Sequence, residues 1–173
     1  MITRKQLWIE CFAAIGVCMV GQFAWADSGP KADVEAIRKI QYELAASDNT
    51  DKVLKLYASG NKTLVFDIVG KHAPMGIYRS AEQLAAGYAP QYAEIAKPKV
   101  TYDELDITVM GNLGVAVSVQ HLVSKPINSD KTYKLTYRET DILKKVKGKW
   151  LIYHSHISVP CNGNLVQCGL VEQ

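Results

Sequence analysis

The stretch from Tyr133 to Pro160 constrains the fold of this chain more than any other, because it is predicted to form a long two-stranded hairpin. Its first arm, Tyr133 to Val146, and its second arm, Trp150 to Val159, are rich in aromatic and β-branched residues. Lys147-Gly148-Lys149 between them is typical of a tight hairpin turn. The upstream segments are expected to pack on this hairpin or to face it.

Residues 1–26 are predicted to be a secretory signal peptide. Arg4 and Lys5 precede an apolar stretch from Leu7 to Val20, and small residues at Ala24 and Ala26 suit cleavage after Ala26. The apolar stretch is shorter than the ~20 residues of a membrane span, and an uncleaved anchor is the alternative. We therefore expect a periplasmic or secreted protein with no stable membrane anchor after cleavage.

The charge of the chain argues against a nucleic-acid-binding protein. The net charge is +3, and loss of Arg4, Lys5 and Glu10 with the leader leaves the remainder near neutral. The densest basic stretch, Lys144 to Lys149, lies at the predicted hairpin tip, where solvation explains it. The common phosphate-binding, dinucleotide-binding and zinc-protease motifs do not occur in the sequence, and no cofactor is predicted.

Cys161 and Cys168 are predicted to form a disulfide that staples the tail of residues 161–173. Cys11 and Cys18 would leave with the leader. An exported chain with two cysteines on either side of an Asn-Gly turn favours one disulfide, with free thiols as the alternative. Two thiols are too few for a structural zinc site, and no metal is predicted.

Three helices are expected ahead of the long strands. Apolar residues recur at spacings of three and four from Ala32 to Ser47, and a short second helix starts at Thr50. Ser80 and Gln83 have capping-box spacing at the start of the third helix, which Pro90 is expected to kink or split. Strands are predicted at residues 62–69, 76–79, 100–109 and 113–124. Helices followed by antiparallel strands predict an α+β fold.

Five short motifs occur in order between residues 32 and 160. They are Leu56-Tyr57-Ala58, Val65-Phe66-Asp67, Gly76-Ile77-Tyr78-Arg79, Arg138-Glu139-Thr140-Asp141, and Gly148-Lys149-Trp150-Leu151-Ile152 followed by His154 to Pro160. This order resembles the SnoaL-like, ketosteroid-isomerase-like branch of the nuclear-transport-factor-two-like superfamily. The resemblance implies one domain at residues 27–160, a cone-shaped barrel of three N-terminal helices packed in a strongly curved, mostly antiparallel sheet. It also implies a pocket at the wide end and pairing of two copies as a homodimer.

Asp67 and Tyr42 are the candidate catalytic residues. Asp67 interrupts an apolar strand, where a carboxylate must be paired, hydrogen-bonded or facing a cavity. The resemblance implies that Asp67 is a general base and that Tyr42 donates a hydrogen bond to a substrate oxygen. The alternatives are a capping or paired carboxylate at Asp67 and a core-packed tyrosine at Tyr42.

Strand alternation places Arg138 and Thr140 on one face of the hairpin and Glu139 and Asp141 on the other. The isomerases keep a neutral, donating aspartate on the corresponding strand. On the resemblance, however, we expect Arg138 and Thr140 to face inward. Asp141 is then a solvated or dimer-face carboxylate.

His121, His154 and His156 lie on neighbouring predicted strands and are candidate ligand-binding groups together with Arg138. Alternation puts His154 and His156 on the face of Trp150. Metal binding is a weak alternative, since side chains two apart on a strand lie ~7 Å apart.

Three functions remain open at this stage. The first is an exported domain that binds a small molecule in a partly apolar pocket. The second is an isomerase, lyase or cyclase that uses Asp67 as a base on a carbonyl substrate, with Tyr42 or a histidine polarising the oxygen. The third is a dimeric interaction module. An enzyme requires Asp67 to lie in a cavity within reach of a second polar donor, and a binder requires the cavity alone.

Overall fold

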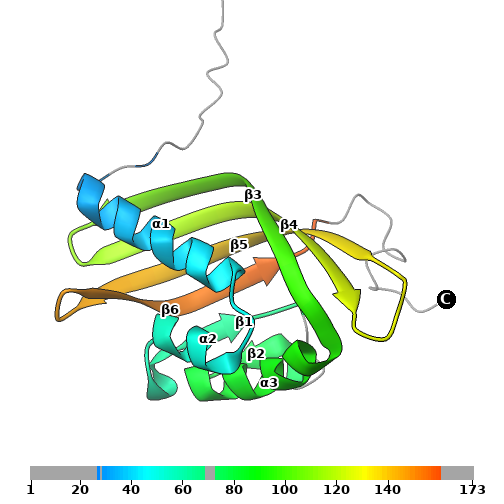
Figure 1. Cartoon of the computed structure of the whole chain (residues 1–173). Coiled ribbons are helices and arrows are strands. Elements are labelled where there is room, and N and C mark those ends of the chain that lie inside the picture. The colour runs from blue at the N-terminus through cyan, green and yellow to red at the C-terminus, as the bar shows by residue number, and fades with distance from the viewer. Residues whose placement is uncertain (1–26, 28, 69–72, 161–173) are drawn as a thin grey trace, which may run out of the picture.

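The computed structural model describes residue 27, residues 29–68 and residues 73–160. Three helices and six strands make up this part of the chain (Figure 1). The helices are α1 (Lys31–Ala45), α2 (Thr50–Leu56) and α3 (Ala81–Glu94), with short 3₁₀ turns at Gly60–Lys62 and Pro74–Gly76. The strands are β1 (Leu64–Phe66), β2 (Ile77–Tyr78), β3 (Ile95–Met110), β4 (Leu113–Pro126), β5 (Tyr133–Val146) and β6 (Lys149–Ser158).

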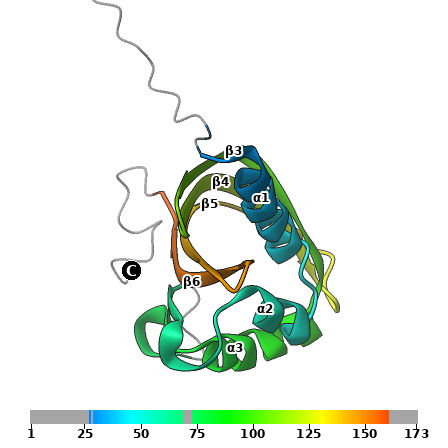
Figure 2. The same cartoon turned by 90° about the vertical axis from the view of Figure 1, so that its left-hand side faces the viewer.

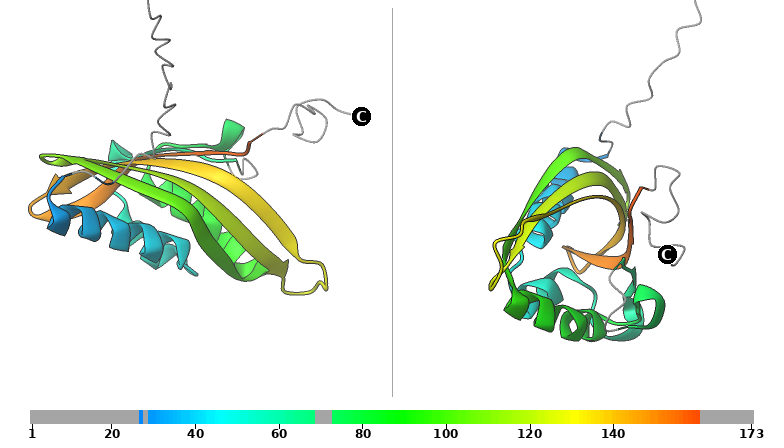
Figure 3. Two further views of the ribbon diagram at one scale, coloured as in Figure 1. Left: turned by 90° about the horizontal axis from the view of Figure 1, so that it is seen from above. Right: turned by 90° about the vertical axis from the view of Figure 1, so that its right-hand side faces the viewer.

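The six strands form one mixed sheet in the order β2-β1-β6-β5-β4-β3. Only the β1–β6 pair is parallel among these neighbours, and the other pairs are antiparallel. The sheet curves strongly around α1 without closing, and α2 and α3 cover its open side (Figures 2 and 3). The fold is therefore the predicted α+β cone of helices in a curved sheet.

Local sequence signals explain where the helices begin. Asn49 caps α2 by accepting a hydrogen bond from the backbone N–H of Lys52, and Ser80 caps α3 by accepting from that of Gln83. The cap predicted at Ser80 is confirmed. Helix α3 is not split at Pro90, which lies inside it. The part of the chain described contains no helix that is long and apolar enough to cross a membrane.

The hairpin predicted at the end of the chain is confirmed. Val146 pairs with Lys149 across a two-residue turn, in which Lys147 has a φ of 50° and Gly148 a φ of 80°. Left-handed φ values at both turn positions match the right-handed twist of the flanking strands. The hairpin therefore keeps its twist up to the tip.

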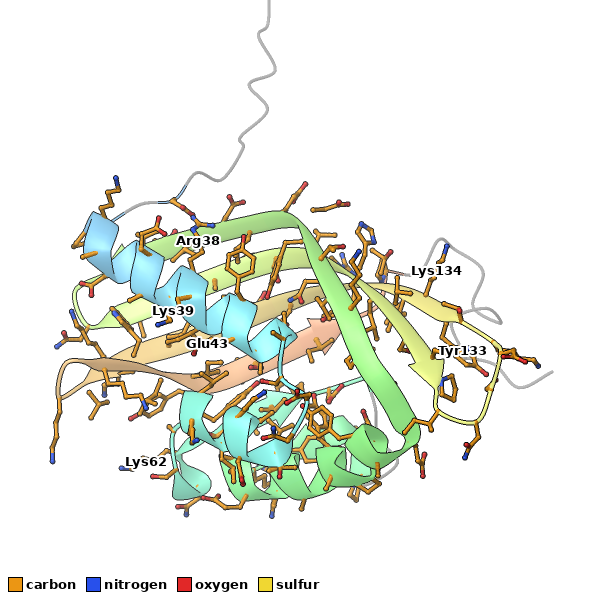
Figure 4. The ribbon with its side chains drawn as sticks, in the orientation of Figure 1. Arg38, Lys39, Glu43, Lys62, Tyr133 and Lys134 are labelled. Carbon is orange, nitrogen blue, oxygen red and sulfur yellow. The ribbon has the colours of Figure 1, made fainter. Side chains whose placement is uncertain are left out.

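Helix α1 is held against the sheet by its apolar stripe. Val34 and Ile37 are buried on this stripe and pack with Trp150 and Ile152 of β6 in the main core. The opposite side of α1 carries charged residues such as Lys39 and Glu43 (Figure 4). Burial of this stripe holds α1 in the concave face of the sheet, where it forms one wall of the interior.

The valines of β4 suggest that their face is the buried one, but the opposite face of the strand is buried. Ala116, Ser118 and Gln120 point into the cone and are buried, whereas Val117 is 41% exposed on the convex face. Small and amide side chains fit the narrow space between the sheet and the helices. The valine stripe is left on the outer surface, where it can contact another molecule.

A β-bulge in β6 reverses its side-chain alternation. Ile142 pairs with His154 and Leu143 pairs with Ile152, so Tyr153 is the extra residue. Ile152 before the bulge and Ser155 after it are both buried. The histidines that follow the bulge therefore face away from the core, contrary to the face predicted from simple alternation.

Candidate functional site

A cavity of about 210 Å³ lies inside the cone, between the C-terminal end of α1, helix α3 and the strands β3 to β5. Its walls are mainly aliphatic and aromatic, with polar groups at a few points. The lining residues used below are Tyr57, Asp67, Tyr88, Gln91, Tyr92, Tyr102, Leu122, Leu135, Tyr137 and Glu139. A mostly apolar cavity with a few converging polar groups is the usual form of a small-molecule site.

Asp67 follows β1 and lies on the cavity wall. The hydroxyl of Tyr88 on α3 donates a hydrogen bond to Asp67 Oδ2 at 2.6 Å. The backbone N–H of Asp67 donates a hydrogen bond to the carbonyl of Gly76, just before β2 at the edge of the sheet. These contacts position the carboxylate between the sheet and α3.

Glu139 on β5 is the second carboxyl group of the cavity, and it is 6% exposed. The side-chain amide of Gln120 donates to Glu139 Oε2 at 2.7 Å and to Ser118 Oγ at 2.9 Å. The hydroxyl of Tyr137 donates to Gln120 Oε1 at 2.8 Å. The carboxyl of Glu139 is therefore held by a network that spans β4 and β5.

Asp141 lies two residues further along β5, deeper in the cone, and is fully buried. The amide of Gln41 on α1 donates to Asp141 Oδ2 at 2.7 Å, and the hydroxyl of Ser155 donates to Oδ1. Tyr57 OH lies 3.1 Å from Ser155 Oγ. This buried cluster joins α1, the end of α2 and the last two strands.

Burial disfavours charge on these two β5 acids, and repulsion from Asp141 adds to the effect on Glu139. Burial, followed by the charge of Asp141, raises the pKa of Glu139 well above its usual value, against the lowering effect of the Gln120 hydrogen bond. Burial raises the pKa of Asp141 to about 6, although its bonds from Ser155 and Gln41 act in the opposite direction. A carboxylic acid that keeps its proton can donate a hydrogen bond into the cavity.

The cavity tyrosines stay neutral. Burial, followed by the charge of Asp67, raises the pKa of Tyr88 well above 10, and burial followed by Glu139 raises the pKa of Tyr137. Burial also raises the pKa of Tyr92 to about 12. The acids and the tyrosines therefore share one desolvated space.

Of the two predicted catalytic residues, the structure places one in the cavity. Asp67 lines it within reach of a second polar donor, Tyr88, as the enzyme hypothesis requires. Tyr42 on α1 is 51% exposed, and its ring is nearly perpendicular to that of Tyr102, with the ring centroids 5.2 Å apart. The prediction that Tyr42 contacts a substrate remains untested, but its side chain does not line this cavity.

The face predicted for β5 is wrong. Arg138 is exposed on the convex face, where it stands opposite Val119 of β4 and Ser158 of β6 in the strand register. Glu139 and Asp141 are buried on the other face. The physical reason is that alternation separates two faces without saying which is buried. Gln41 of α1 and Gln120 of β4 donate hydrogen bonds to Asp141 and Glu139, and these bonds stabilise the two acids in the interior of the cone.

The three candidate histidines do not line the cavity. His121 lies between Thr136 Oγ1 at 2.8 Å and Asp103 Oδ2 at 2.6 Å on the convex side of the sheet. The Nδ1 of His154 donates a hydrogen bond to the backbone carbonyl of Leu64. The ring of His156 is perpendicular to that of Phe66, with the ring centroids 5.9 Å apart. Within the described ranges, no group of three or more His, Cys, Asp and Glu residues is arranged to hold a metal ion.

The sequence-based interpretation missed Glu139 and the tyrosines Tyr88, Tyr92, Tyr102 and Tyr137. Only Glu139 had a usable signal, because an acid on a β-rich arm next to Asp141 suggests a shared interior. The tyrosines come from α3, β3 and β5 and gather only through the curvature of the sheet. Cys161 and Cys168 and the leader lie outside the described residues, and the disulfide and cleavage remain predictions.

Residues 34–162 match the model of the SnoaL-like domain family, which covers well over half of the chain. The chain belongs to the SnoaL-like domain family. Its fold is that of the nuclear-transport-factor-two-like superfamily, as the resemblance implied. No curated protein sequence matches the chain.

Solved structures of this superfamily share the fold. A nuclear transport factor 2-like superfamily protein from Salmonella enterica serovar Typhimurium is 22% identical, with a TM-score of 0.63 over 78% of this chain and 92% of that one. A protein of the nuclear transport factor 2-like family from Streptomyces avermitilis, proposed to be a dehydratase, is 11% identical, with a TM-score of 0.64 over 77% of this chain and 99% of that one. A hexachlorocyclohexane dehydrochlorinase, LinA type 2, is 9% identical, with a TM-score of 0.60 over 75% and 86%. At these identities the SnoaL-like chain shares their fold, and fold alone does not assign function.

Proposed function

We propose that this SnoaL-like protein binds one compact organic molecule in the cavity of its cone. The observation that carries the proposal is the cavity itself, which combines aromatic and aliphatic walls with the carboxyl groups of Asp67 and Glu139. A dry cavity of about 150 Å³ is enough to hold benzene. At about 210 Å³, this cavity suits a single substituted ring or a branched molecule of that size.

A buried donor supports the view that the bound molecule carries a polar atom. The side-chain nitrogen of Gln91 on α3 is buried and has no hydrogen-bond partner among the described residues. A buried amide left unpaired costs about 1–3 kcal/mol. An acceptor oxygen on the bound molecule beside α3 removes this cost.

The test is a binding screen with ring-sized probes of different charge. Phenol, benzyl alcohol, cyclohexanone, benzylamine and benzoate would be titrated by ligand-observed NMR and by thermal unfolding. Binding to the folded state alone raises the midpoint of unfolding, so at least one probe is expected to shift it. Absence of binding by every probe at millimolar concentration would contradict the proposal.

A cavity-blocking variant supplies the matched control. Leu135 lines the cavity, whereas Leu113 is 41% exposed on β4 and outside it. Leu135→Trp is expected to abolish probe binding, and Leu113→Trp is expected to leave it unchanged. Equal binding by both variants would place the bound probe elsewhere on the protein.

Proton transfer next to a carbonyl is the second candidate function. It is favoured by one observation, namely that a hydrogen-bonded carboxylate and a second carboxyl group line the same cavity. In this reaction Asp67 takes the proton from the carbon beside the carbonyl, and the C–H electron pair passes into the enolate. The enolate oxygen accepts a hydrogen bond from protonated Glu139, and the proton on Asp67 returns to carbon.

Exchange of the α-protons of cyclohexanone in D₂O, followed by NMR, tests this reaction. Asp67→Asn is expected to reduce enzyme-dependent exchange about 100-fold or more, because a placed base contributes about 10²–10⁴-fold. Asp130→Asn changes an exposed carboxylate outside the cavity and is the matched control. Exchange no faster than in buffer would rule out this substrate class and leave binding as the function.

We also propose that two copies pair through the convex face of the sheet. Phe66, Val117 and Ile142 are 36%, 41% and 36% exposed there, and Thr140, His154 and His156 lie between them by strand pairing. A partly apolar face suits a second copy of itself. Val117→Lys is expected to shift the mass measured by light scattering from dimer to monomer, whereas Leu113→Lys at the strand end is not.

Export of the mature chain completes the proposal. Cleavage after Ala26 and a Cys161–Cys168 disulfide would be read from the mass of the protein recovered from the periplasm or medium, with and without reduction. Retention of residues 1–26 in that protein would contradict cleavage.

A further inference from the structure

We propose that the molecule held in the cavity is a small organic cation, such as a quaternary ammonium or a protonated amine. This inference rests on the proposed binding function and names the class of ligand. The structure favours it through two features of one space, an excess of acidic groups and a wall of tyrosine rings.

The acidic groups come from two parts of the sheet. Asp67 and Glu139 line the cavity, and Asp141 lies behind Glu139 on the same strand. Among the described residues that line the cavity, none is Lys, Arg or His. Burying carboxyl groups together is costly unless they are neutralised by a proton or by a positive charge. A ligand cation supplies that charge beside Glu139, whose carboxyl accepts from the neutral amide of Gln120, whereas an anion adds to the repulsion.

The aromatic walls complement a cation of low charge density. Tyr88 and Tyr92 on α3 lie with ring centroids 6.1 Å apart and planes at 88°, so two perpendicular rings form a corner of the cavity. Tyr88 and Tyr137 donate their hydroxyl protons to protein acceptors, which leaves the rings as the contact they offer. Ring faces attract ammonium groups, and quaternary ammonium ions are bound by aromatic cages of this kind.

An organic cation fits the site better than a metal ion. The described residues form no cluster of three or more metal-type ligands, and the remaining walls, including Leu122 and Leu135, are aliphatic. A metal ion prefers several oxygen or nitrogen ligands and keeps its water. A methylated ammonium group sheds water more readily and contacts apolar walls as well as rings.

Choline and 3,3-dimethylbutan-1-ol are the decisive pair of probes, because they share shape and hydroxyl group and differ in one nitrogen and its charge. We expect choline to bind at least about tenfold more tightly by isothermal titration calorimetry, and benzylamine to exceed benzyl alcohol similarly. Equal or tighter binding by the neutral partners would overturn the inference and leave the binding function standing. Failure of cationic, neutral and anionic probes alike would overturn both.

Two variants trace the preference to the residues named. Glu139→Gln keeps the shape of the side chain but cannot ionise when the cation binds, and it is expected to reduce the preference for choline to about threefold or less. Tyr92→Leu removes one wall ring and is expected to weaken choline binding about tenfold. Tyr133→Leu, at a 56% exposed tyrosine outside the cavity, is the control and should leave choline binding unchanged.

Proton release keeps the inference testable should Glu139→Gln fail to fold. The titratable groups that face Glu139 are Asp67, Asp141, Tyr57, Tyr88, Tyr102 and Tyr137. The tyrosines stay neutral. The proton that the protein releases when a cation binds therefore comes mainly from the carboxyl group of Glu139 or Asp141. Titrations of choline in buffers of different ionisation enthalpy should show this release at pH 6, and 3,3-dimethylbutan-1-ol should show none. Choline binding with no proton release and no charge preference would refute the inference.

Discussion

Replacing Asp141 by asparagine is expected to stabilise the protein at pH 8 and not at pH 4. Asp141 is fully buried and accepts hydrogen bonds from Gln41 Nε2 and Ser155 Oγ. An asparagine keeps this network satisfied. Its oxygen accepts from Gln41, its nitrogen donates to Ser155 Oγ, and the serine proton turns to the hydroxyl of Tyr57, 3.1 Å away.

The size of the effect follows from the raised pKa of Asp141. The folded protein raises the pKa of Asp141 from its ordinary value of 3.8 to about 6. The folded state therefore holds the proton more tightly than the unfolded state, and the free energy of unfolding falls as pH rises from about 4 to about 6. A shift of roughly two units corresponds to about 3 kcal/mol, which asparagine does not lose.

Relief at the neighbouring acid adds to the effect. The charge of Asp141 contributes to the raised pKa of Glu139, so its removal makes ionisation of Glu139 less costly. The difference in unfolding free energy between Asp141→Asn and the wild type is therefore expected to grow by at least about 3 kcal/mol between pH 4 and pH 8.

Urea denaturation followed by circular dichroism at pH 4 to 8 measures this difference. Asp130→Asn, at a fully exposed carboxylate, is the control and should change stability by less than about 0.5 kcal/mol at every pH. Packing costs of the asparagine do not depend on pH, so the slope is the test. A difference that stays flat or shrinks with rising pH would refute the buried, weakened acid at Asp141.

Two further substitutions test the packing around α3. Gly87→Ala places a Cβ 2.6 Å from the buried ring of Tyr78 and is expected to cost about 1–3 kcal/mol in urea denaturation, despite the better helix propensity of alanine. A gain in stability would show that the ring moves aside. Leu84→Ala removes a fully buried side chain and is expected to cost about 2–5 kcal/mol. Leu113→Ala, at a 41% exposed position, should cost far less, and equal losses would contradict the core assignment.

The identity of most elements was predictable from the chain alone. The hairpin turn at Gly148 and the cap at Ser80 depend on residues that are neighbours in sequence. For Asp67 the sequence predicted a paired, hydrogen-bonded or cavity-facing carboxylate, because a bare charge inside an apolar strand is costly to desolvate. These are local rules, and the structure obeys them.

Which face of the sheet is the interior was decided only by the tertiary structure. Alternation along β5 separates Glu139 and Asp141 from Arg138, but both face assignments satisfy it. The bulge at Tyr153 then reverses β6, so His154 turns outward although Ile152 before it is buried. A bulge depends on how two strands pair, which no single strand encodes.

The candidate site was likewise predictable in part from the sequence, and in part was decided only by the tertiary structure. The sequence by itself predicted an α+β order of elements and, through its resemblance to a known family, a cone. For Asp67 it left open a place in the cavity and a paired or capping carboxylate. Only the curvature of the sheet brought Glu139 of β5 and Tyr88 of α3 to the same cavity. The physical reason is that side-chain periodicity acts over a few residues, whereas desolvation of an acid and the hydrogen bonds that offset it depend on partners far apart in the chain.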